Sequence, residues 1–575
     1  MDGANPPSDT ASRTPGEAQE LRGPVLDVLR VLLANFEGRD QVLAIVGRLI
    51  ARNAELEQQL AKTLFKKSEQ VSTAQLLLAL GALGLTGSSA SASADDGRVQ
   101  PEALDDADSK LRHASGIDDP KPDDAKTPRP PRQPCTRTPA PAHLERIPNE
   151  IPVPAAERAC PTCGAERTCI GHEPTEVIDL IPAKVVVRVD LREKLVCRPC
   201  EGEHVRAPLP EKVVPGGKLS LRFVAQILID KYVDGLPLHR QRERYARLGI
   251  DLSVSTLCDQ VKWSTDLLRP LWRAALDEVI AARVMHVDGT GLPVLDRAVA
   301  GGKRLGTLWG YVGTDRTNAT AAYVYTSTGK KVGQKPGELG PEDVLARREG
   351  PTVADASNVF DASFKRPGLI ECGCNMHGRR YWIKALDAGD QRAALPIAAY
   401  KKLYQIEDEI KGHDPDGKLA ERIARSKPVF DELIAWCHAR EAHEPPSSKL
   451  GTAIRYTLNN RIALGRFLED GNIPIDNGAV ERLHIRAALT RKNFLFAGAD
   501  TGGDRAAIAF TIFGSCRLVG IDPLVYLSDV LLCLTQPIRL TEVKELLPAA
   551  WKARRDAAAK AAADASSDAT AGPGP

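Results

Sequence analysis

The spacing of apolar residues predicts a long helical region near the N-terminus. Residues 24 to about 66 place apolar side chains at helical intervals, and from Val42 the intervals alternate between four and three. This heptad pattern is typical of a short parallel coiled coil. A single amphipathic helix packed on its own domain is the alternative, but "ARNAELEQQLAK" is too polar to be buried on several sides. The heptad positions are Val42, Val46, Leu49, Asn53, Leu56, Leu60 and Thr63.

A second helical region, over residues 213–283, has the pattern of a helix-turn-helix. In "LHRQRERYARLGIDLSVSTLCDQVKW" a basic helix is followed by a turn at Gly249 and a new helix start at Ser253. Its arginines could meet DNA phosphates, although an ordinary helical hairpin with a solvated basic face remains the alternative. These arginines are Arg240, Arg242, Arg244 and Arg247.

After Arg283 the pattern changes from helical spacing to alternation. "VMHVDGTGLPVLD" predicts a strand ending in Asp288, and "GTLWGYVGT" and "NATAAYVYT" predict two more strands in a meander. A helix-compatible stretch separates these from "PTVA", a fourth strand that ends at Asp355, and from a fifth strand in "LIECGCNMHGRRYW". This is the ribonuclease H-like order, and we expect it over residues 284–500 with a helical insertion at about 385–470.

The first and fourth strands lie side by side in that order, which brings Asp288 and Asp355 to one edge of the sheet. Two such carboxylates repel each other unless a cation holds them. Hard oxygen ligands suit Mg²⁺ (or Mn²⁺), and a two-metal site would serve displacement at phosphorus. Asp361, six residues after Asp355, is a rival for the second acid.

The stretch "IDNGAVERLHIRAALTRKN" supplies a candidate for the third carboxylate, Glu481. If Gly478 is the N-cap of a helix, Glu481 lies at N3 and could simply cap that helix. The other interpretation makes Glu481 the third metal ligand, with the basic residues after it facing the DNA backbone. Those residues are Arg482, Arg486, Arg491 and Lys492.

Two Cys-x-x-Cys pairs, in "CPTC" and "CRPC", predict a zinc ribbon over residues 151–212. Four thiolates on two turns, joined by β-like sequence, give the tetrahedral site that Zn²⁺ prefers. Two redox dithiols are the weaker alternative, because neither pair opens a helix in a thioredoxin-like setting. Cys169 and His172 lie between the pairs and could replace one ligand. The four predicted ligands are Cys160, Cys163, Cys197 and Cys200.

Length and composition add the remaining boundaries. A chain of 575 residues is too long for one core, and its net charge of +2 means that any polyanion must be met by local basic patches. Residues 1–23, the Pro- and Asp-rich linker 86–150 and the Ala-rich tail 549–575 are expected to be disordered. A helical dimerisation region over 24–85 and a C-terminal helical region over 501–548 complete a multidomain α+β protein. With neither a membrane span nor a signal peptide expected, we predict a cytoplasmic location.

Several motifs, in order and spacing, resemble the insertion sequence 66 family of transposases from about residue 42 to 535. They include "KYVDGLPLHRQ", "HVDGT", "VADAS", "CNMHGRRYW", "KLGTAIRYTLNN" and "DGNIPIDNGAVERLHIRAALTRKNFLFAGADTGGDRAA". The resemblance implies that Asp288, Asp355 and Glu481 form a DDE triad and that the helical insertion lies between the last two. Gly478 stands where the family usually has a second Asn, and "CNMHGRR" also departs from the usual form.

The resemblance implies a transposase that cuts element ends and joins the freed 3′ hydroxyls to target DNA. A non-catalytic DNA-binding protein derived from such an enzyme is the alternative. We expect DNA and a second copy of the chain as partners, with accessory proteins of the same element left open. His377, Arg379 and Arg380 are expected near the DNA, although Cys374 and His377 could equally be a packing pair in the core.

Overall fold

The computed structural model describes residues 102–116, 216–315 and 318–570, with short stretches between 145 and 214. The predicted coiled coil over 42–63, the four predicted zinc ligands and His172 lie outside the described residues. Among the helices that are described, none has the length and apolar character needed to span a bilayer.

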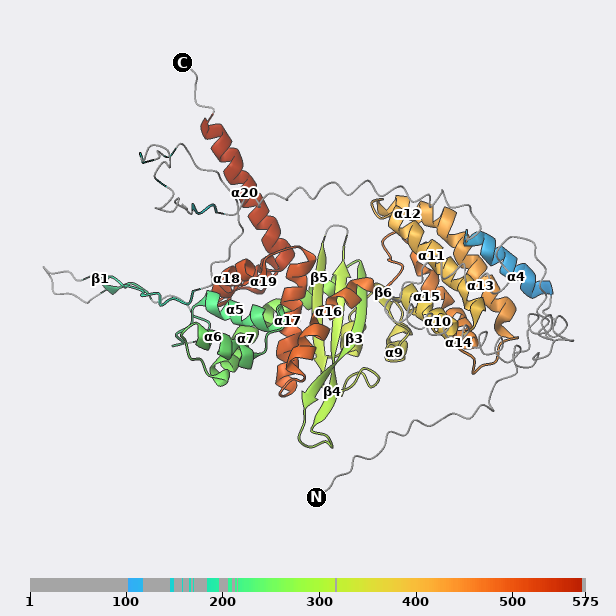
Figure 1. The fold of residues 1–575 in the computed structure, drawn as a ribbon, viewed down its shortest axis with the longest axis horizontal. Helices are drawn as coiled ribbons and strands as arrows, with labels where there is room; N and C mark the ends of the chain where they lie inside the picture. Colours follow the sequence, from blue (N-terminus) through green and yellow to red (C-terminus); the bar gives the residue numbers. More distant parts are fainter. Residues whose placement is uncertain are drawn as a thin grey trace, which may run out of the picture.

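A five-stranded sheet forms the centre of the molecule, in the order β5-β4-β3-β6-β7 (Figure 1). β3 is antiparallel to β4 and β4 to β5, whereas β3–β6 and β6–β7 are parallel pairs. The first strand of the sheet therefore lies beside the fourth, as the order of the apolar segments predicts. The bounds are β3 Val284–Leu295, β4 Lys303–Thr314, β5 Ala319–Thr326, β6 Gly350–Ala354 and β7 Leu369–Gly373.

β3 is longer than the sequence predicts, because it continues past Asp288 to Leu295. The apolar alternation does not stop at the acid, since Leu292 and Val294 are also buried and keep β3 paired with β4. The parallel pairing with β6 is much shorter and ends at His286. Asp288 therefore lies just beyond the paired part of β3 and β6, and Asp355 follows β6 directly.

Helices cover both faces of this sheet. α16 (Gly478–Phe494) and α17 (Asp500–Leu518) pack on one face, and the end of α7 (Val254–Ala281) packs on the other together with α8 (Pro341–Ala346). α7 begins after its N-cap Ser253, whose hydroxyl accepts the N–H of Thr256 at 3.0 Å, so the predicted helix start is confirmed. The two preceding helices are α5 (Leu221–Tyr232) and α6 (Leu238–Arg247).

The helices between β7 and α16 build a second hydrophobic core beside the sheet (Figure 1). Trp382 and Trp436 pack edge to face at its centre, with ring centroids 5.8 Å apart. After this insertion the chain returns to the sheet through α16. The helices are α10 (Asn375–Asp387), α11 (Ala394–Glu409), α12 (Pro415–Glu421), α13 (Lys427–Glu441), α14 (Lys449–Asn459) and α15 (Arg461–Gly465).

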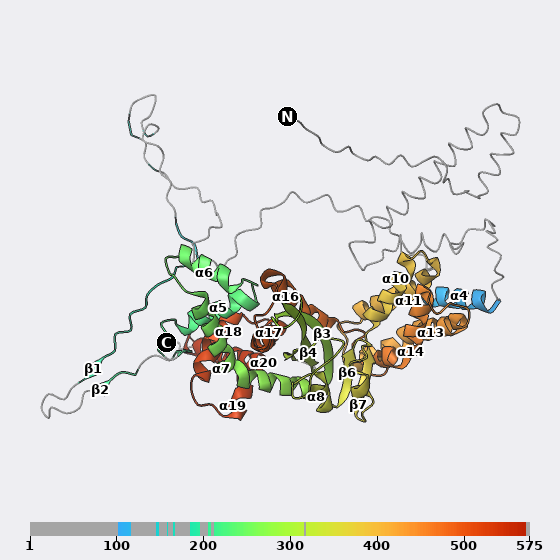
Figure 2. The ribbon, with the colours of Figure 1, turned by 90° about the horizontal axis from the view of Figure 1, so that it is seen from below.

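The linker predicted to be disordered over 86–150 contains a helix, α4 (Glu102–Ala114), which lies against α11 and α13 of the insertion (Figure 2). Leu104 and Leu111 are buried there, and Asp108 binds two side chains of α13. The prediction is wrong for this stretch because it averages composition over the whole linker. Two leucines and one aspartate are enough to fold α4, because α11 and α13 supply the rest of the core.

The tail predicted to be disordered over 549–575 is helical as far as Thr570, within α20 (Pro548–Thr570). Alanine has the highest helix propensity, so an Ala-rich segment continues a helix once packing has started it. Trp551 provides that start, since it is buried edge to face on Tyr526 and donates to Asp529 at 2.6 Å. Tyr526 and Asp529 belong to α18 (Pro523–Leu534), and the short α19 (Leu540–Glu545) lies between the two helices.

Candidate active site

Asp288, in β3 just beyond the part of that strand that pairs with β6, and Asp355, which directly follows β6, lie side by side. The ammonium group of Lys330 connects them, at 2.6 Å from Oδ1 of Asp288 and 2.9 Å from Oδ2 of Asp355. Lys330 belongs to the segment between β5 and α8, whose Gly-rich sequence carries no periodic pattern. Only 14% of the Asp288 side chain and 16% of the Asp355 side chain are exposed, so the two charges share a poorly solvated place.

The electrostatics of this pair favour a cation. Burial alone lowers the pKa of Lys330, but Asp288 and Asp355 outweigh that effect and raise the pKa above its ordinary value. Among the described residues, Oδ1 of Asp355 is buried without a hydrogen-bond partner. An orphaned carboxylate oxygen in such a place is costly and needs an explanation. Hard carboxylate oxygens close together, one of them unsatisfied, fit a divalent cation such as Mg²⁺.

Glu481 lies on the first turn of α16, but its position in the helix differs from the prediction. The N-cap is Asn477 and Gly478 is already the first helical residue, so Glu481 lies at N4, one position beyond the capping box. The free N–H of Gly478 is taken by Asp476 at 2.8 Å. The proposed capping arrangement, with Gly478 as N-cap, is therefore wrong.

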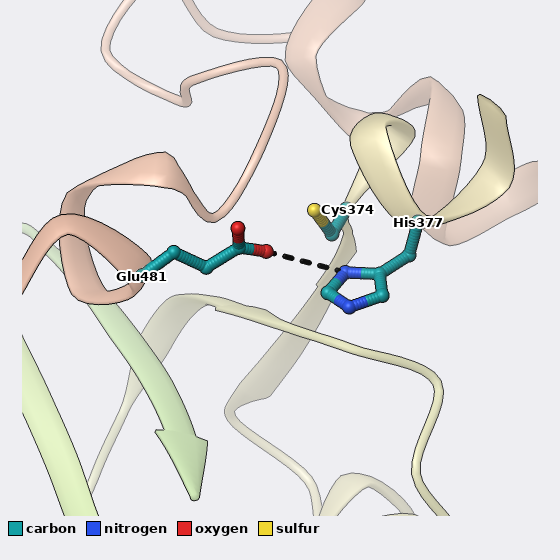
Figure 3. A group of neighbouring side chains, drawn as sticks. All are labelled: Cys374, His377 and Glu481. Atoms are coloured by element: carbon teal, nitrogen blue, oxygen red, sulfur yellow. Dashed lines mark ion pairs between the residues drawn. The ribbon is translucent and has the colours of Figure 1, made fainter. Parts of the chain in front are cut away.

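The carboxylate of Glu481 points toward α10 (Figure 3). Its Oε1 lies 3.6 Å from Nδ1 of His377, and its Oε2 lies 3.5 Å from Nη2 of Arg380. Burial and the charge of Arg380 lower the pKa of His377, whereas Asp355 and Asp288 act in the opposite direction. The start of α10 thus lies within electrostatic reach of both the aspartate pair and Glu481.

Two residues of the same segment, which sequence reasoning missed, attach α16 to β3. Asn477 is fully buried, donates to the carbonyl of Val287 at 2.8 Å and contacts Nδ1 of His286 at 3.0 Å. His484, one turn after Glu481, places Nε2 at 3.2 Å from the carbonyl oxygen of Asp288. Both lie in "IDNGAVERLHIRAALTRKN", the segment that contains Glu481. The sequence does not indicate which polar residues of this helix point toward the sheet.

Asp361, the rival second acid, is in a different environment. It is exposed as the first residue of α9 (Asp361–Phe364), and its charge adds to the burial that raises the pKa of Glu371 on β7. Lys330 bridges Asp355 and not Asp361 to Asp288.

The predicted DNA-binding arginines divide into exposed and internally bound groups. Arg244 forms a 2.8 Å ion pair with Asp230, whose side chain is 1% exposed, so it helps to hold α6 on α5. Arg491 donates to Thr290 at 3.1 Å and to the carbonyl of Gly291, which anchors it on β3. Arg379 and Arg380 are half-buried on α10. The exposed members are Arg240, Arg242, Arg247, Arg482, Arg486 and Lys492, of which Arg486 also donates to the carbonyl of Val233 at 3.1 Å.

The described part of the zinc-ribbon segment is small. Lys194–Leu195 (β1) pairs antiparallel with Val205–Arg206 (β2), on either side of the second Cys-x-x-Cys pair in the sequence. Cys169 is exposed. The predicted zinc ligands themselves remain a prediction from the sequence.

Two family models match the chain. The model described as "Transposase IS66 family" matches residues 216–505, from α5 through the sheet and insertion to the start of α17. The model described as "zinc-finger binding domain of transposase IS66" matches residues 157–201, which contain both Cys-x-x-Cys pairs. The second match supports zinc binding by that segment.

Relatives from Sinorhizobium fredii are similar over most of the chain. The uncharacterized protein y4hP is 34% identical over 438 residues, which cover 72% of this chain and 77% of the relative. The uncharacterized protein y4qI is 33% identical over 441 residues, which cover 75% and 79%. A third, the uncharacterized protein y4jD, is 30% identical over 425 residues, covering 72% and 81%.

Proposed function

Because the chain belongs to the IS66 family of transposases, we propose that it binds the ends of an insertion element and catalyses metal-dependent cleavage and joining of DNA strands. The observation that carries this proposal is the pair of partly buried carboxylates of Asp288 and Asp355, which share the ammonium group of Lys330 and leave one oxygen unsatisfied. The sheet order supports a ribonuclease H-like catalytic core. Glu481, on the helix that packs beside them, is the third acid of the proposed triad.

Each residue of the site has a separate task in this proposal. Asp288 and Asp355 would hold the divalent cation, and Glu481 would complete the ligand set once its carboxylate has turned from His377 and Arg380. When bound, Mg²⁺ or Mn²⁺ supplies Lewis acidity at the phosphate and makes water or a 3′ hydroxyl a better nucleophile. His484 and Asn477 fix the distance between α16 and β3, and so hold the backbone of Asp288 in place.

The DNA is expected to bind along the exposed arginine and lysine side chains. Arg482, Arg486 and Lys492 are exposed on α16 beyond Glu481 and can hold phosphates close to the acids. Arg240, Arg242 and Arg247 offer a second basic surface on α6. The zinc-finger segment is the third DNA-binding part that we propose.

The experiment that tests the triad compares Asp288→Asn, Asp355→Asn and Glu481→Gln, with Asp361→Asn as the matched control. Each variant is assayed for melting temperature, binding to the element's end DNA, and cleavage and joining in Mg²⁺. The three triad variants should bind DNA but cleave it on the order of a thousandfold more slowly, because a charged metal ligand is lost at the chemical step. Asp361→Asn should cleave normally.

Near-normal cleavage by Glu481→Gln would remove that residue from the triad. Loss of cleavage in Asp361→Asn, with Asp355→Asn still active, would make Asp361 the second acid of the triad in place of Asp355. A wild-type protein that binds element ends yet cleaves in no divalent cation would leave the non-catalytic DNA-binding protein as the function.

A further inference from the structure

Three possible metal ligands of different chemistry converge beside the proposed triad (Figure 3). Cys374 is the N-cap of α10, His377 lies in the first turn of that helix, and Glu481 approaches from α16. Their ligand atoms, one sulfur, one imidazole nitrogen and one carboxylate oxygen, all lie within 4.8 Å of one another. The proposed magnesium site accounts for Glu481 but gives no task to Cys374 or to Nδ1 of His377.

The sulfur of Cys374 is in a setting that suits a metal-bound thiolate. The side chain is fully buried, and its Sγ accepts the backbone N–H of Asn477 at 3.3 Å. Its place at the N-terminus of α10 adds the favourable end of the helix dipole. Burial raises the pKa of the thiol to about 12, so without a metal the thiol keeps its proton.

The other two ligands, His377 and Glu481, face each other. Nδ1 of His377 and Oε1 of Glu481 are 3.6 Å apart, whereas Arg380 lies beside the other nitrogen of His377 and the other oxygen of Glu481. Nη2 of Arg380 is 3.5 Å from Oε2 of Glu481, and its Nη1 is 3.2 Å from Nε2 of His377. Because an arginine can only donate, Nε2 must accept, and the proton of the neutral imidazole is assigned to Nδ1.

This arrangement makes Arg380 a competitor of any metal at His377. A cation on Nδ1 requires the imidazole proton on Nε2, where it would meet the donor of Arg380. Arg380 must therefore turn away when the cation enters, and its positive charge adds to the cost. This competition can be tested, because removal of Arg380 should strengthen metal binding rather than weaken it.

We propose that Cys374, His377 and Glu481 form a second metal site, specific for a thiophilic divalent cation of the zinc class. One thiolate, one imidazole and one carboxylate are the ligands that Zn²⁺ accepts at a site with one open position. Binding releases the thiol proton to solvent and leaves the imidazole neutral. The site depends on the proposed function in one respect: it shares Glu481, so a zinc-class ion keeps that carboxylate from the magnesium site.

The test uses Co²⁺ with the full chain, to which one equivalent of Zn²⁺ has first been added so that the zinc-ribbon segment is filled and the proposed site is left for Co²⁺. Wild type should take up Co²⁺ with a sulfur-to-cobalt absorption band, and Cys374→Ser should lose that band and bind more than about 100-fold more weakly. Cys372→Ser is the matched control, because Cys372 is also buried, two residues earlier on β7, and should leave the band unchanged. His377→Ala should lose the band as well, which keeps the test valid if Cys374→Ser does not fold.

Arg380→Gln should bind Co²⁺ more tightly, by about tenfold, since a donor and a charge are removed. Equal uptake and equal spectra in wild type and Cys374→Ser would overturn the proposal, and so would weaker binding by Arg380→Gln. Added Zn²⁺ should also inhibit Mg²⁺-dependent cleavage in wild type but not in Cys374→Ser. The band is measured without DNA, so its absence refutes this site while the triad stands, and its presence without any cleavage refutes the triad alone.

Discussion

Lys330 is the residue whose charge offsets the repulsion between two neighbouring, partly buried carboxylates. In Lys330→Gln, Asp288 and Asp355 should repel each other, and the metal-free protein should lose about 1–2 kcal/mol of stability. Mg²⁺ should in turn bind at about tenfold lower concentration, because no ammonium group has to be displaced. The raised pKa of Lys330 means that its stabilising effect is fully present from neutral pH up to its ordinary value of 10.5 and is lost only as the pH rises further.

Thermal melts of Lys330→Gln across a Mg²⁺ titration measure both effects at once. The exposed neighbour Lys331 supplies the control, since Lys331→Gln changes the same charge away from the acids. If Lys330→Gln and Lys331→Gln melted alike at every Mg²⁺ concentration, Lys330 would not be the counter-ion of the pair.

His286 gives the molecule a predictable response to acid. Burial lowers its pKa from 6.5 to about 4, although the hydrogen bond to Asn477 opposes the shift. The folded state thus holds the neutral ring, and its contribution is complete above pH 6.5 and lost as the pH falls toward 4. A shift of this size corresponds to about 3 kcal/mol over that window.

Urea unfolding at several pH values between 7.5 and 4.5 tests this expectation. His286→Gln keeps an amide that can bond to Asn477 and removes the titrating ring, so its stability should fall less steeply with acid than that of wild type. The pKa of His484 is lowered in the same direction, and its contribution stays in both proteins. Identical pH profiles would mean that protonated His286 is tolerated in the fold.

At the scale of elements, one aspartate of α4 binds two side chains of the insertion and adds to the packing of Leu104 and Leu111. Asp108 accepts from Nε1 of Trp436 at 2.6 Å and from Arg440 at 2.6 Å, and Arg440 is only 1% exposed. Asp108→Ala would leave a buried guanidinium without its partner, which costs about 3–5 kcal/mol for a fully buried pair. We expect α4 to separate from α13 and become sensitive to protease.

Asp106→Ala is the matched control for α4. Asp106 is an exposed residue of the same helix whose ion pair is with Lys110 of its own helix, so its loss should change stability by less than about 1 kcal/mol. The comparison is made by limited proteolysis and by urea unfolding. Equal protease sensitivity of the two variants would show that Asp108 does not hold α4.

These elements also show how far the sequence alone can reach. The alternation of apolar residues predicts the strand order, and the order places Asp288 beside Asp355 because both follow the last paired residues of two parallel neighbouring strands. Lys330 could not be foreseen, since a loop without periodicity gives no direction for its side chain. The position of Glu481 was one residue off, because Asn477 and Gly478 both suit a helix N-terminus and only the bonds to β3 decide between them.

At the scale of the whole molecule, the described residues of one chain hold one set of the three acids. A transposase that cuts two element ends together needs two such sets, and the proposed function therefore calls for two chains. The heptad region over residues 42–63 lies outside the described residues, so pairing through it remains a prediction from the sequence. α4 lies between that region and the sheet in the sequence and packs on α11 and α13, so a chain paired at its N-terminus would also be attached to the helical insertion.

The last prediction is that residues 42–63 pair two chains in parallel. With Leu49 and Leu56 at d, Asn53 falls at an a position, where it costs stability but selects a two-stranded register by bonding to its partner. Leu49→Lys combined with Leu56→Lys should turn a dimer into a monomer in sedimentation, because four charges would enter the seam. Ala51→Lys with Gln58→Lys adds the same charges seven residues apart on the outer face and should leave the dimer intact. A wild-type protein that is monomeric at micromolar concentration, or a dimer that both double variants leave unchanged, would place the contact between the two active sites elsewhere in the chain.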